Sequence, residues 1–425
     1  MVLFAVSLFF ASSCMLFNGD NENNSSISIV DVTPKALLVT DGIEPVARTA
    51  AVGANDFAFR LGAALINNYD GKNFVFSPYS VWLPLAALVN AADIQYRAAL
   101  TNALRASGIT EGDINRAASR MLYDLTNARD EGERGHYNPL KITNAIFVDK
   151  KVTLRRDFAQ TYMDFYRGSS INVDFSSRDA VDAVNRWAGK NTDGLITDLI
   201  KGFDPLIVAA IANAIYFSDQ WAWEFDPDET EEEIFHGPAG NTKAFYMLRE
   251  GSNQLYYEDN KVQAIPLWFK HNAGMYIILP KAGGAEALFS SMTNEYFAEI
   301  RENSFLAEGK LLLPRFSIEN DINGLKESLE MLGVPLFEED SITRLIEEPI
   351  PLYLSDAIQK AVIKVDEKGT TAAAVTVLPI GATSAGPQPN KPFEMICDRP
   401  FMFILCGYTY DGGAQILFTG IVNQP

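Results

Sequence analysis

Apolar residues at helical spacing open the folded part of the chain. Phe57, Leu61 and Leu65 recur every four residues, which places them on one face of a helix. Asn55-Asp56 lies just before them and offers side-chain acceptors for the first free backbone amides of a helix. The pattern predicts a helix that starts near residue 55 and buries one face.

A second block predicts a strand that runs directly into a helix. Asn73 to Phe76 is a short apolar run, and Ser77-Pro78 follows it. The Ser77 hydroxyl can cap a helix, and proline suits the first helical position. Residues 79 to 92 are apolar on nearly all sides, which predicts a buried helix.

The segment from Glu367 to Val377 can form either a loop or a strand. Gly369 has no Cβ and allows a hinge. Thr370 to Val377 are small or β-branched residues that fit a pleated strand without crowding it. A segment that can occupy either state is a candidate conformational switch.

Composition and charge narrow the class of protein. The 425 residues are 48% hydrophobic and 21% charged, as in ordinary globular proteins. No linker-like stretch occurs after about residue 50, so we expect one large domain. The net charge of -19 argues against binding to nucleic acid or to anionic membranes. The acidic run from Asp226 to Glu233 contains no glycine, unlike a calcium loop, so we interpret it as a solvated loop.

Candidate catalytic and metal-binding chemistry is sparse. The sequence contains neither Cys-x-x-Cys nor His-Glu-x-x-His, so we expect no metal and no cofactor. Cys397 and Cys406 flank an apolar strand pattern and cannot meet across it, so we expect reduced core thiols. The only histidines are His136, His236 and His271, and no Gly-x-Ser-x-Gly elbow occurs, which argues against a hydrolase.

Residues 1–19 have the pattern of an export signal. Val2 to Phe10 is an apolar run too short to span a bilayer. The small residues Ala11 to Ser13 follow it, and such residues suit cleavage by signal peptidase. Residues 20–50 are polar and aperiodic, which predicts a linker to a single domain over residues 51–425.

Export allows two outcomes. Cleavage near Ser13 or Gly19 would release a secreted protein. Alternatively, Ala11-Ser12-Ser13-Cys14 resembles a degenerate bacterial lipobox. Cys14 would then be acylated, and the protein would be a cell-surface or periplasmic lipoprotein.

Several motifs together resemble the serpin family. The switch segment is followed by Asp398-Arg399-Pro400-Phe401, which is similar to the strand after the serpin reactive loop. Asn73 to Pro78 is similar to a serpin motif at the start of a helix. Further matches occur in the family's order at residues 144–148, 173–175, 183–187, 191–196, 213–217, 275–280, 313–316 and 416–422. The resemblance runs from about residue 55 to the end of the chain.

The resemblance implies an α+β serpin fold. Such a fold has three β-sheets, about nine helices and an exposed reactive loop, here over residues 367–392. Serpins that are activated by heparin need a basic helix face, so the net charge of -19 argues against heparin. We expect a monomer.

The resemblance also assigns residues to the region where the central sheet opens and to the hinge. The sheet-opening residues are Ser77, Ser80, Asn185 and Gln359. Gln359 stands where many relatives have histidine. Because glutamine does not titrate near neutral pH, we expect no histidine-driven pH switch there. The hinge residues are Glu367, Gly369, Thr370, Ala372, Ala373 and Ala374.

The mechanism implied by the resemblance is suicide inhibition. A protease attacks the loop and forms an acyl-enzyme, and the cleaved loop then inserts as a new strand in the central sheet. Because side chains alternate along a strand, one set would face the core: Thr370, Ala372, Ala374, Thr376, Leu378 and Ile380. Pro379 and Gly381 disfavour the last part of that strand.

The usual family distance from the hinge glycine places the reactive bond at Thr383-Ser384, with Ala382-Thr383 as the second choice. The similar Thr-Ser and proline-rich tail of prokaryotic serpins supports this position. No Lys or Arg occurs between Gly369 and Asn390, which disfavours trypsin-like targets. Elastase- or subtilisin-like serine proteases are favoured. Cysteine proteases are a further class, because they also form an acyl-enzyme.

A non-inhibitory serpin that acts as a carrier or storage protein is the alternative. Such members typically have a charged or bulky hinge that resists insertion. The small residues from Thr370 to Ala374 differ from that pattern.

Overall fold

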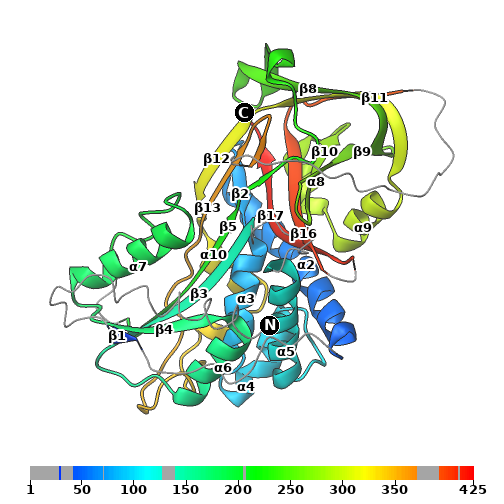
Figure 1. The fold of residues 1–425 in the computed structure, drawn as a ribbon. Coiled ribbons are helices and arrows are strands. Elements are labelled where there is room, and N and C mark those ends of the chain that lie inside the picture. The colour runs from blue at the N-terminus through cyan, green and yellow to red at the C-terminus, as the bar shows by residue number, and fades with distance from the viewer. Residues whose placement is uncertain are drawn as a thin grey trace, which may run out of the picture.

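The computed structural model describes residues 28–29, 42–69, 71–126, 139–203, 207–370, 392–409 and 412–425. Its helices and strands form a mixed α+β fold (Figure 1). The α-helices are α2 (Glu44–Leu65), α3 (Pro78–Leu88), α4 (Ile94–Ala103), α5 (Glu111–Thr126), α6 (Arg156–Tyr166), α7 (Arg178–Asn191), α8 (Gly284–Ser291), α9 (Asn294–Glu302) and α10 (Leu325–Met331). Short 3-10 helices are η1 (Ile66–Asn68), η2 (Pro227–Glu229) and η3 (Pro335–Phe337).

The strands are β1 (Ser28–Ile29), β2 (Phe74–Phe76), β3 (Leu140–Asp149), β4 (Gly168–Val173), β5 (Ala209–Phe217), β6 (Asp219–Gln220), β7 (Glu231–Gly237), β8 (Gly240–Glu258), β9 (Val262–Trp268), β10 (Ala273–Pro280), β11 (Phe305–Pro314), β12 (Phe316–Asp321), β13 (Lys360–Val365), β14 (Gly369–Thr370), β15 (Phe393–Ile396), β16 (Phe401–Tyr408) and β17 (Ala414–Val422). The largest sheet has the order β15-β11-β8-β9-β10-β16-β17-β2, and β7 pairs with β8. Every residue of β10 and β17 is buried. These strands therefore form the centre of the core.

The remaining strands form three smaller sheets in the described residues. One has the order β1-β4-β3-β5, and the other two are the pairs β12-β13 and β14-β6. We expected three sheets in all, and the hydrogen bonds instead define four groups. Two features change the number of sheets in the described residues. β8 joins two parts of the large sheet, which lowers the number, and β5 and β13 do not pair with each other, which raises it.

Helices cover both faces of the four-stranded sheet. α7 packs over β3 and β5 on one face, where the rings of Trp187 and Phe147 meet edge to face at 6.1 Å. The helices α2, α3 and α5 lie on the other side of the sheet (Figure 1), and their apolar side chains join the main core. β5 therefore separates two clusters of buried side chains.

The predicted strand-to-helix block is confirmed. β2 leads into α3, the Ser77 hydroxyl accepts a hydrogen bond from the Ser80 amide at 3.4 Å, and Pro78 is the first helical residue. α3 ends at Leu88, before the expected residue 92. It is buried nearly all round, as its composition predicted.

The expected start of the first helix is wrong. α2 begins at Glu44, well before Asn55. Asn55 is 5% exposed in the middle of the helix. Its amide nitrogen donates to Ala414 O at 2.7 Å, and its Oδ1 accepts from Ile416 N and from the Gln415 amide at 3.0 Å each. Asn55 therefore joins α2 to β17 and does not cap a helix.

Part of the expected linker also belongs to the fold. β1 pairs with β4 along the edge of the four-stranded sheet, and α2 begins within the range 20–50. The acidic run is not a loop throughout, because η2 and the exposed strand β7 include most of it. Its first strand residues are solvated because β7 lies at a sheet edge.

The cysteine prediction is confirmed. Cys397 and Cys406 are free and buried, and burial raises the pKa of the Cys406 thiol to about 12. His136 lies outside the described residues, whereas His236 is exposed. None of the described helices is both long and apolar enough to cross a bilayer.

Replacing Asn55 with alanine should lower the free energy of unfolding by about 2–4 kcal/mol, because three buried hydrogen bonds are lost. The exposed Asn67 of η1 provides a matched control, and N67A should change stability by less than about 0.5 kcal/mol. Denaturant unfolding followed by circular dichroism measures both variants. A loss of only about 1 kcal/mol in N55A, the usual effect of removing a cap, would contradict the prediction.

Candidate functional site

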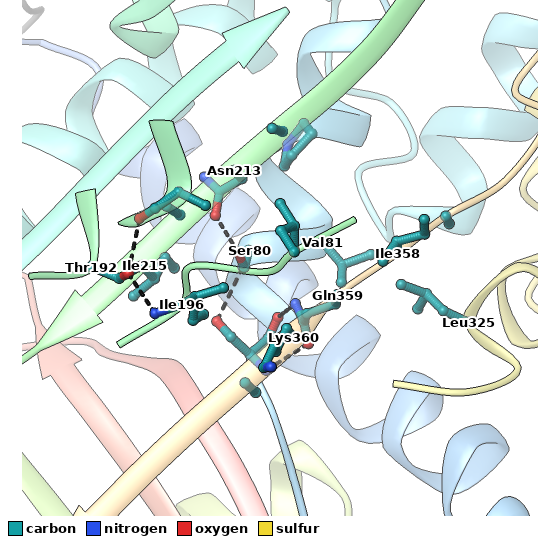
Figure 2. Close-up of a pocket in the computed structure, with 18 of the residues that line it drawn as sticks. Ser80, Val81, Thr192, Ile196, Asn213, Ile215, Leu325, Ile358, Gln359 and Lys360 are labelled. Carbon is teal, nitrogen blue, oxygen red and sulfur yellow. Dashed lines mark hydrogen bonds between the residues drawn. The ribbon is translucent and has the colours of Figure 1, made fainter. Parts of the chain in front are cut away.

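Two strand edges face a common cavity. β5 is the last strand of its sheet, and β13 pairs only with β12 in the part of the chain that the structure describes. A cavity of about 460 Å³ is lined by both strands, by α3 and by the segment after α7. Figure 2 shows Asn213 and Ile215 on the β5 side and Gln359 and Lys360 on the β13 side. Such free edges carry backbone donors and acceptors that a further strand can use.

A polar cluster ties the β13 side of the cavity to α3. Gln359 Oε1 accepts from Ser77 N at 3.0 Å, and Gln359 Nε2 donates to Ser77 O at 2.8 Å. The Ser77 hydroxyl donates to Leu417 O at 2.6 Å. Both the oxygen and the nitrogen of the Gln359 side-chain amide therefore bond to the backbone of Ser77. Ser77 in turn bonds to β17 through its hydroxyl.

A second cluster ties the β5 side to the same helix. The Ser80 hydroxyl donates to Asn213 Oδ1 (Figure 2). Asn213 Nδ2 donates to Asn144 Oδ1, and Asn144 Nδ2 donates to Tyr166 O, each at 2.7 Å. Sequence reasoning missed Asn144 and Asn213 as site residues. The sequence feature that could have identified each of them is an asparagine within a mostly apolar strand.

Asn185 does not join these clusters. Its Nδ2 donates to Ile200 O at 2.8 Å, and its Oδ1 accepts from Ile200 N at 3.0 Å. It therefore holds the segment after α7, which borders the cavity. Of the four residues assigned to the sheet-opening region, the structure brings the other three together.

Lys360 connects β13 to the segment after α7. Its Nζ lies 2.8 Å from Asp198 Oδ1 and 2.9 Å from Glu319 Oε1. These two carboxylates raise the pKa of Lys360 above its ordinary value. Because Asp198 is largely exposed, solvent screens its part of the interaction.

The hinge begins as a strand. Gly369 and Thr370 pair antiparallel with β6, so that Thr370 lies opposite Asp219 and is 2% exposed. Gly369 has φ 143°, and an added Cβ would lie 2.2 Å from Asp219 O. Only glycine fits this close approach without strain.

The segment that follows β6 binds the chain just before Gly369. Trp221 N donates to Lys368 O, and Phe225 N donates to Glu367 O, both at 2.9 Å. The indole nitrogen of Trp221 donates to Asp366 O at 2.9 Å. These bonds fix the root of the loop, by which we mean residues 366–368.

A buried carboxylate adds an ionic anchor to the loop root. Glu367 is 6% exposed, and its Oε1 accepts from the Thr230 hydroxyl at 2.7 Å and from Arg315 Nε at 2.6 Å. Burial alone disfavours the charged carboxylate, but the hydroxyl and the guanidinium outweigh it and lower the pKa of Glu367. Glu367 is therefore held as a charged group.

The strand that receives the hinge has a buried carboxyl group of its own. Asp219 is 1% exposed, and its Oδ2 accepts from His271 N at 2.9 Å. Asp219 Oδ1 lies 2.9 Å from His271 Nδ1 and accepts from Gln220 N at 2.8 Å. The pairing of Asp219 with His271 could not be predicted from the local sequence, because Asp219 is in β6 and His271 lies between β9 and β10.

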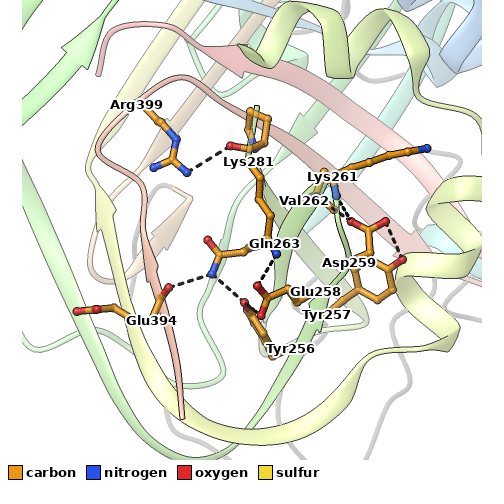
Figure 3. A network of polar contacts seen from close by, with 11 residues as sticks. Tyr256, Tyr257, Glu258, Asp259, Lys261, Val262, Gln263, Lys281, Glu394 and Arg399 are labelled. Carbon is orange, nitrogen blue, oxygen red and sulfur yellow. Dashed lines mark hydrogen bonds and ion pairs between the residues drawn. The ribbon is translucent and has the colours of Figure 1, made fainter. Parts of the chain in front are cut away.

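The chain after the loop is anchored in the large sheet. Phe393 of β15 lies opposite Gly309 of β11, and its ring stacks on Tyr256 with centroids 4.2 Å apart. Gln263 Nε2 donates to Tyr256 Oη at 2.8 Å and to Glu394 O at 2.9 Å (Figure 3). The two ends of the loop are therefore held in different sheets.

Several predicted residues lie outside the described ranges. They are the reactive-bond residues Ala382, Thr383 and Ser384, the hinge residues Ala372, Ala373 and Ala374, and Cys14. In the ranges that the structure does describe, no group of three or more His, Cys, Asp or Glu side chains is placed to hold a metal ion.

Replacing Glu367 with glutamine should lower the free energy of unfolding by about 1–3 kcal/mol at neutral pH, because charged hydrogen bonds to Arg315 and Thr230 are lost. The lowered pKa of Glu367 means that this stabilisation is present above the pKa of the unfolded chain. It is lost as the pH falls through the lower pKa of the folded state.

The stability difference between wild type and E367Q should therefore shrink below about pH 4. Denaturant unfolding between pH 3 and pH 8 measures it, with exposed Glu302 as the control position in E302Q. A difference that stays constant across this range would refute the assignment of the charge to Glu367.

The chain matches a known family over most of its length. The family profile described as serpin (serine protease inhibitor) matches residues 52–425. Alpha-1-antiproteinase of Rattus norvegicus is 29% identical over 387 residues, which cover 90% of this chain and 90% of that protein.

Solved structures agree with this match. Tengpin, a thermophilic serpin in its native state, has a TM-score of 0.76 at 25% identity and covers 94% of this chain and 100% of its own. Human thyroxine-binding globulin also has a TM-score of 0.76 at 25% identity, over 89% of this chain and 99% of its own. The family is one of protease inhibitors rather than catalytic enzymes, although this last neighbour is named for binding thyroxine. The profile match, the α+β fold and these neighbours together show that this chain belongs to the serpin family.

Proposed function

We propose that this serpin traps a serine protease as an acyl-enzyme by inserting its cleaved reactive loop between β5 and β13. The pairing of Gly369 and Thr370 with β6 carries this proposal. These two hinge residues already have strand pairing with β6, and β5, which precedes β6 in the chain, has a free edge in the described residues. Insertion would extend a pairing that exists before cleavage.

The register of β14 gives each loop residue a partner on β5. Continuing the observed pairing puts Ala372 opposite Phe217 and Ile380 opposite Ala209, where β5 begins. β5 can therefore pair loop residues up to 380. Pro379, which lacks a backbone donor, falls next to the end, where it costs at most one hydrogen bond.

The same register decides which loop side chains would face the core. Directly opposed residues of antiparallel strands lie on the same face of a sheet. In β5, Ile215 and Phe217 belong to the main core, whereas Ala212 and Ala214 belong to the cluster under α7. The residues that would face the main core are Thr370, Ala372, Ala374, Thr376, Leu378 and Ile380. This set equals the one selected by alternation along the loop, and it is small where insertion starts.

The energy of insertion favours the cleaved loop. A dozen new backbone hydrogen bonds at ~1 kcal/mol each would supply on the order of 10 kcal/mol. About fourteen inserted residues at ~3.3 Å each would carry an attached protease ~46 Å. A bond at Thr383-Ser384 leaves every residue that β5 can pair on the inserted side, which supports this bond over any bond before residue 381. Ala382-Thr383 is the second choice.

The targets that fit this loop are elastase- or subtilisin-like serine proteases, because no Lys or Arg occurs between Gly369 and Asn390. Cysteine proteases remain a further class. The apolar run and small residues within 1–19 support export, either as a secreted protein or as a lipoprotein acylated at Cys14. The protein would meet its target outside the cytoplasm.

A carrier or storage function is the second candidate, since human thyroxine-binding globulin shares the fold. The buried, strand-paired Thr370 and the small residues that follow it favour the inhibitor. A carrier needs no hinge that can enter a sheet.

Incubation of the purified protein with pancreatic elastase and with subtilisin tests the inhibitor directly. A denaturing gel should show a band near the summed masses, and mass spectrometry should find a released peptide that begins at Ser384. The cleaved protein should melt at a higher temperature, because insertion adds backbone hydrogen bonds. Cleavage without a covalent complex and without this gain would overturn the inhibitor and leave the carrier as the better candidate.

Replacing Thr370 with arginine should convert the inhibitor into a substrate. Position 370 is already buried opposite Asp219 before cleavage, and burial of a charge costs several kcal/mol, so T370R should lose the strand pairing that insertion extends. We expect the ratio of cleaved to trapped protein to rise at least about tenfold, which corresponds to ~1.4 kcal/mol. The exposed Thr49 of α2 is the control, and T49R should trap as well as wild type. An unchanged ratio in T370R would argue against insertion.

A further inference from the structure

The segment that follows α7 borders the place where the loop would enter the sheet. Residues 192–203 line the cavity between β5 and β13. Thr192 and Ile196 of this segment lie at the cavity together with Ile215 of β5 and Lys360 of β13 (Figure 2). A strand that enters the cavity therefore meets this segment.

Two sets of bonds hold the segment on the side of α7 and β3. The side-chain amide of Asn185 in α7 bonds to the backbone N–H and C=O of Ile200. Lys141 Nζ of β3 donates to the two carboxylate oxygens of Asp193 at 2.8 and 2.9 Å. These bonds tie the segment to the four-stranded sheet, which includes β5.

The ion pair of Asp198 with Lys360 reaches the other side of the cavity. The Lys360 side chain is 8% exposed, and a buried charge needs a partner nearby. It has two, because Lys360 Nζ lies 2.9 Å from Glu319 Oε1 and 2.8 Å from Asp198 Oδ1. Glu319 is on β12, which pairs with β13, so its bond stays within one pair of strands. The bond to Asp198 joins that pair to the segment after α7.

The strand registers bring one loop residue to this ion pair. Asp366 and Gly369 form an antiparallel bridge. Continuing that pairing along β13 puts Val375 opposite Lys360, and continuing the pairing of β14 with β6 along β5 puts Val375 opposite Ala214. Directly opposed residues lie on the same face of a sheet, and Ala214 belongs to the cluster under α7. Val375 would therefore enter beside Lys360 on the face that α7 covers.

The spacing of strands shows what this entry requires. Neighbouring strands lie about 4.8 Å apart, so a loop strand paired with both edges would hold β5 and β13 about 9.6 Å apart. The segment is anchored to the sheet of β5 through Asp193 and to β13 through Asp198. Its bond to Lys360 therefore opposes both the separation of the two edges and the entry of Val375.

We propose that the ion pair of Asp198 with Lys360 controls the rate of loop insertion and thereby the ratio of cleaved to trapped protein. This inference rests on the proposed function and deepens it, because it names the residues that regulate insertion. An acylated protease is released by hydrolysis unless the loop inserts first. A weaker ion pair should therefore favour trapping.

Uptake of a separate strand measures insertion without a protease. The probe is an acetylated peptide with the sequence of residues 370–380, which can add to the same strand edges. The fraction of protein with a raised melting temperature is followed over time. D198N should take up the peptide about two- to fivefold faster than wild type, as the loss of one largely exposed ion pair allows.

E319Q is the matched control. It removes the other carboxylate of the same lysine, changes the net charge by the same amount, and leaves the bond to Asp198 in place. Its uptake rate should stay within about 1.5-fold of wild type, because its bond does not reach the segment after α7. A general loss of stability would speed both variants alike, and that result would overturn the proposal.

The lysine supplies a second check. K360M should take up the peptide at least as fast as D198N, and adding D198N to K360M should change the rate no further, because the two residues act through one bond. K360R keeps the charge and should stay within about twofold of wild type. A further acceleration in D198N/K360M would overturn the ion pair as the cause.

Incubation with pancreatic elastase separates this proposal from the inhibitory function. D198N should lower the ratio of cleaved to trapped protein about two- to fivefold, and E319Q should leave it unchanged. If wild type traps elastase but D198N behaves like E319Q in both assays, the ion pair has no such role and the inhibitor stands. If D198N speeds peptide uptake but no variant forms a covalent complex, the control of insertion stands and the inhibitory function fails.

Discussion

The backbone groups along two strand edges are the constraint on which the rest of this structure depends. Buried N–H and C=O groups need hydrogen-bond partners, and β5 and β13 each direct a row of such groups to the same cavity. The start of α3 holds both sides, because Ser77 bonds to Gln359 and Ser80 bonds to Asn213. The native sheet is thereby kept incomplete by a few polar side chains on one helix. A strand of small side chains that reaches this place gains partners on both edges.

The two ends of the loop differ in what holds them. The chain before the hinge is held by main-chain bonds to Trp221 and Phe225 and by the ion pair of Glu367. The chain after the loop is held by the stacking of Phe393 on Tyr256 in another sheet. Cleavage between them would therefore leave the second end in place. Only the end before the loop is paired in a register that continues along β5, toward the cavity between β5 and β13.

The sequence predicted those features whose cause lies within a few residues. The Ser77 cap, the proline after it and the glycine at the hinge follow from local geometry, and the structure places Ser77 and Pro78 as expected. Asn55 was misread because its partners are on β17, more than 350 residues away in the chain. An asparagine before an apolar helical stripe has the pattern of a cap, and only tertiary packing shows that it bonds to another element. The pairing of Asp219 with His271 was missed for the same reason.

The glutamine at position 359 bears on where acid can act on the site. Gln359 both accepts from and donates to Ser77, and neither bond depends on pH near or below neutrality. Separating Gln359 from α3 therefore costs two hydrogen bonds, about 1 kcal/mol each, at any such pH. The carboxylate of Glu367 does titrate, and its lowered pKa means that acid weakens its bonds to Arg315 and Thr230. Acid thus loosens the loop root while the contact between α3 and β13 keeps its strength. Beside the cavity, the ion pair of Lys360 with Asp198 also weakens in acid, because Lys360 lowers the pKa of that carboxyl, whereas the bonds of Gln359 to Ser77 do not titrate.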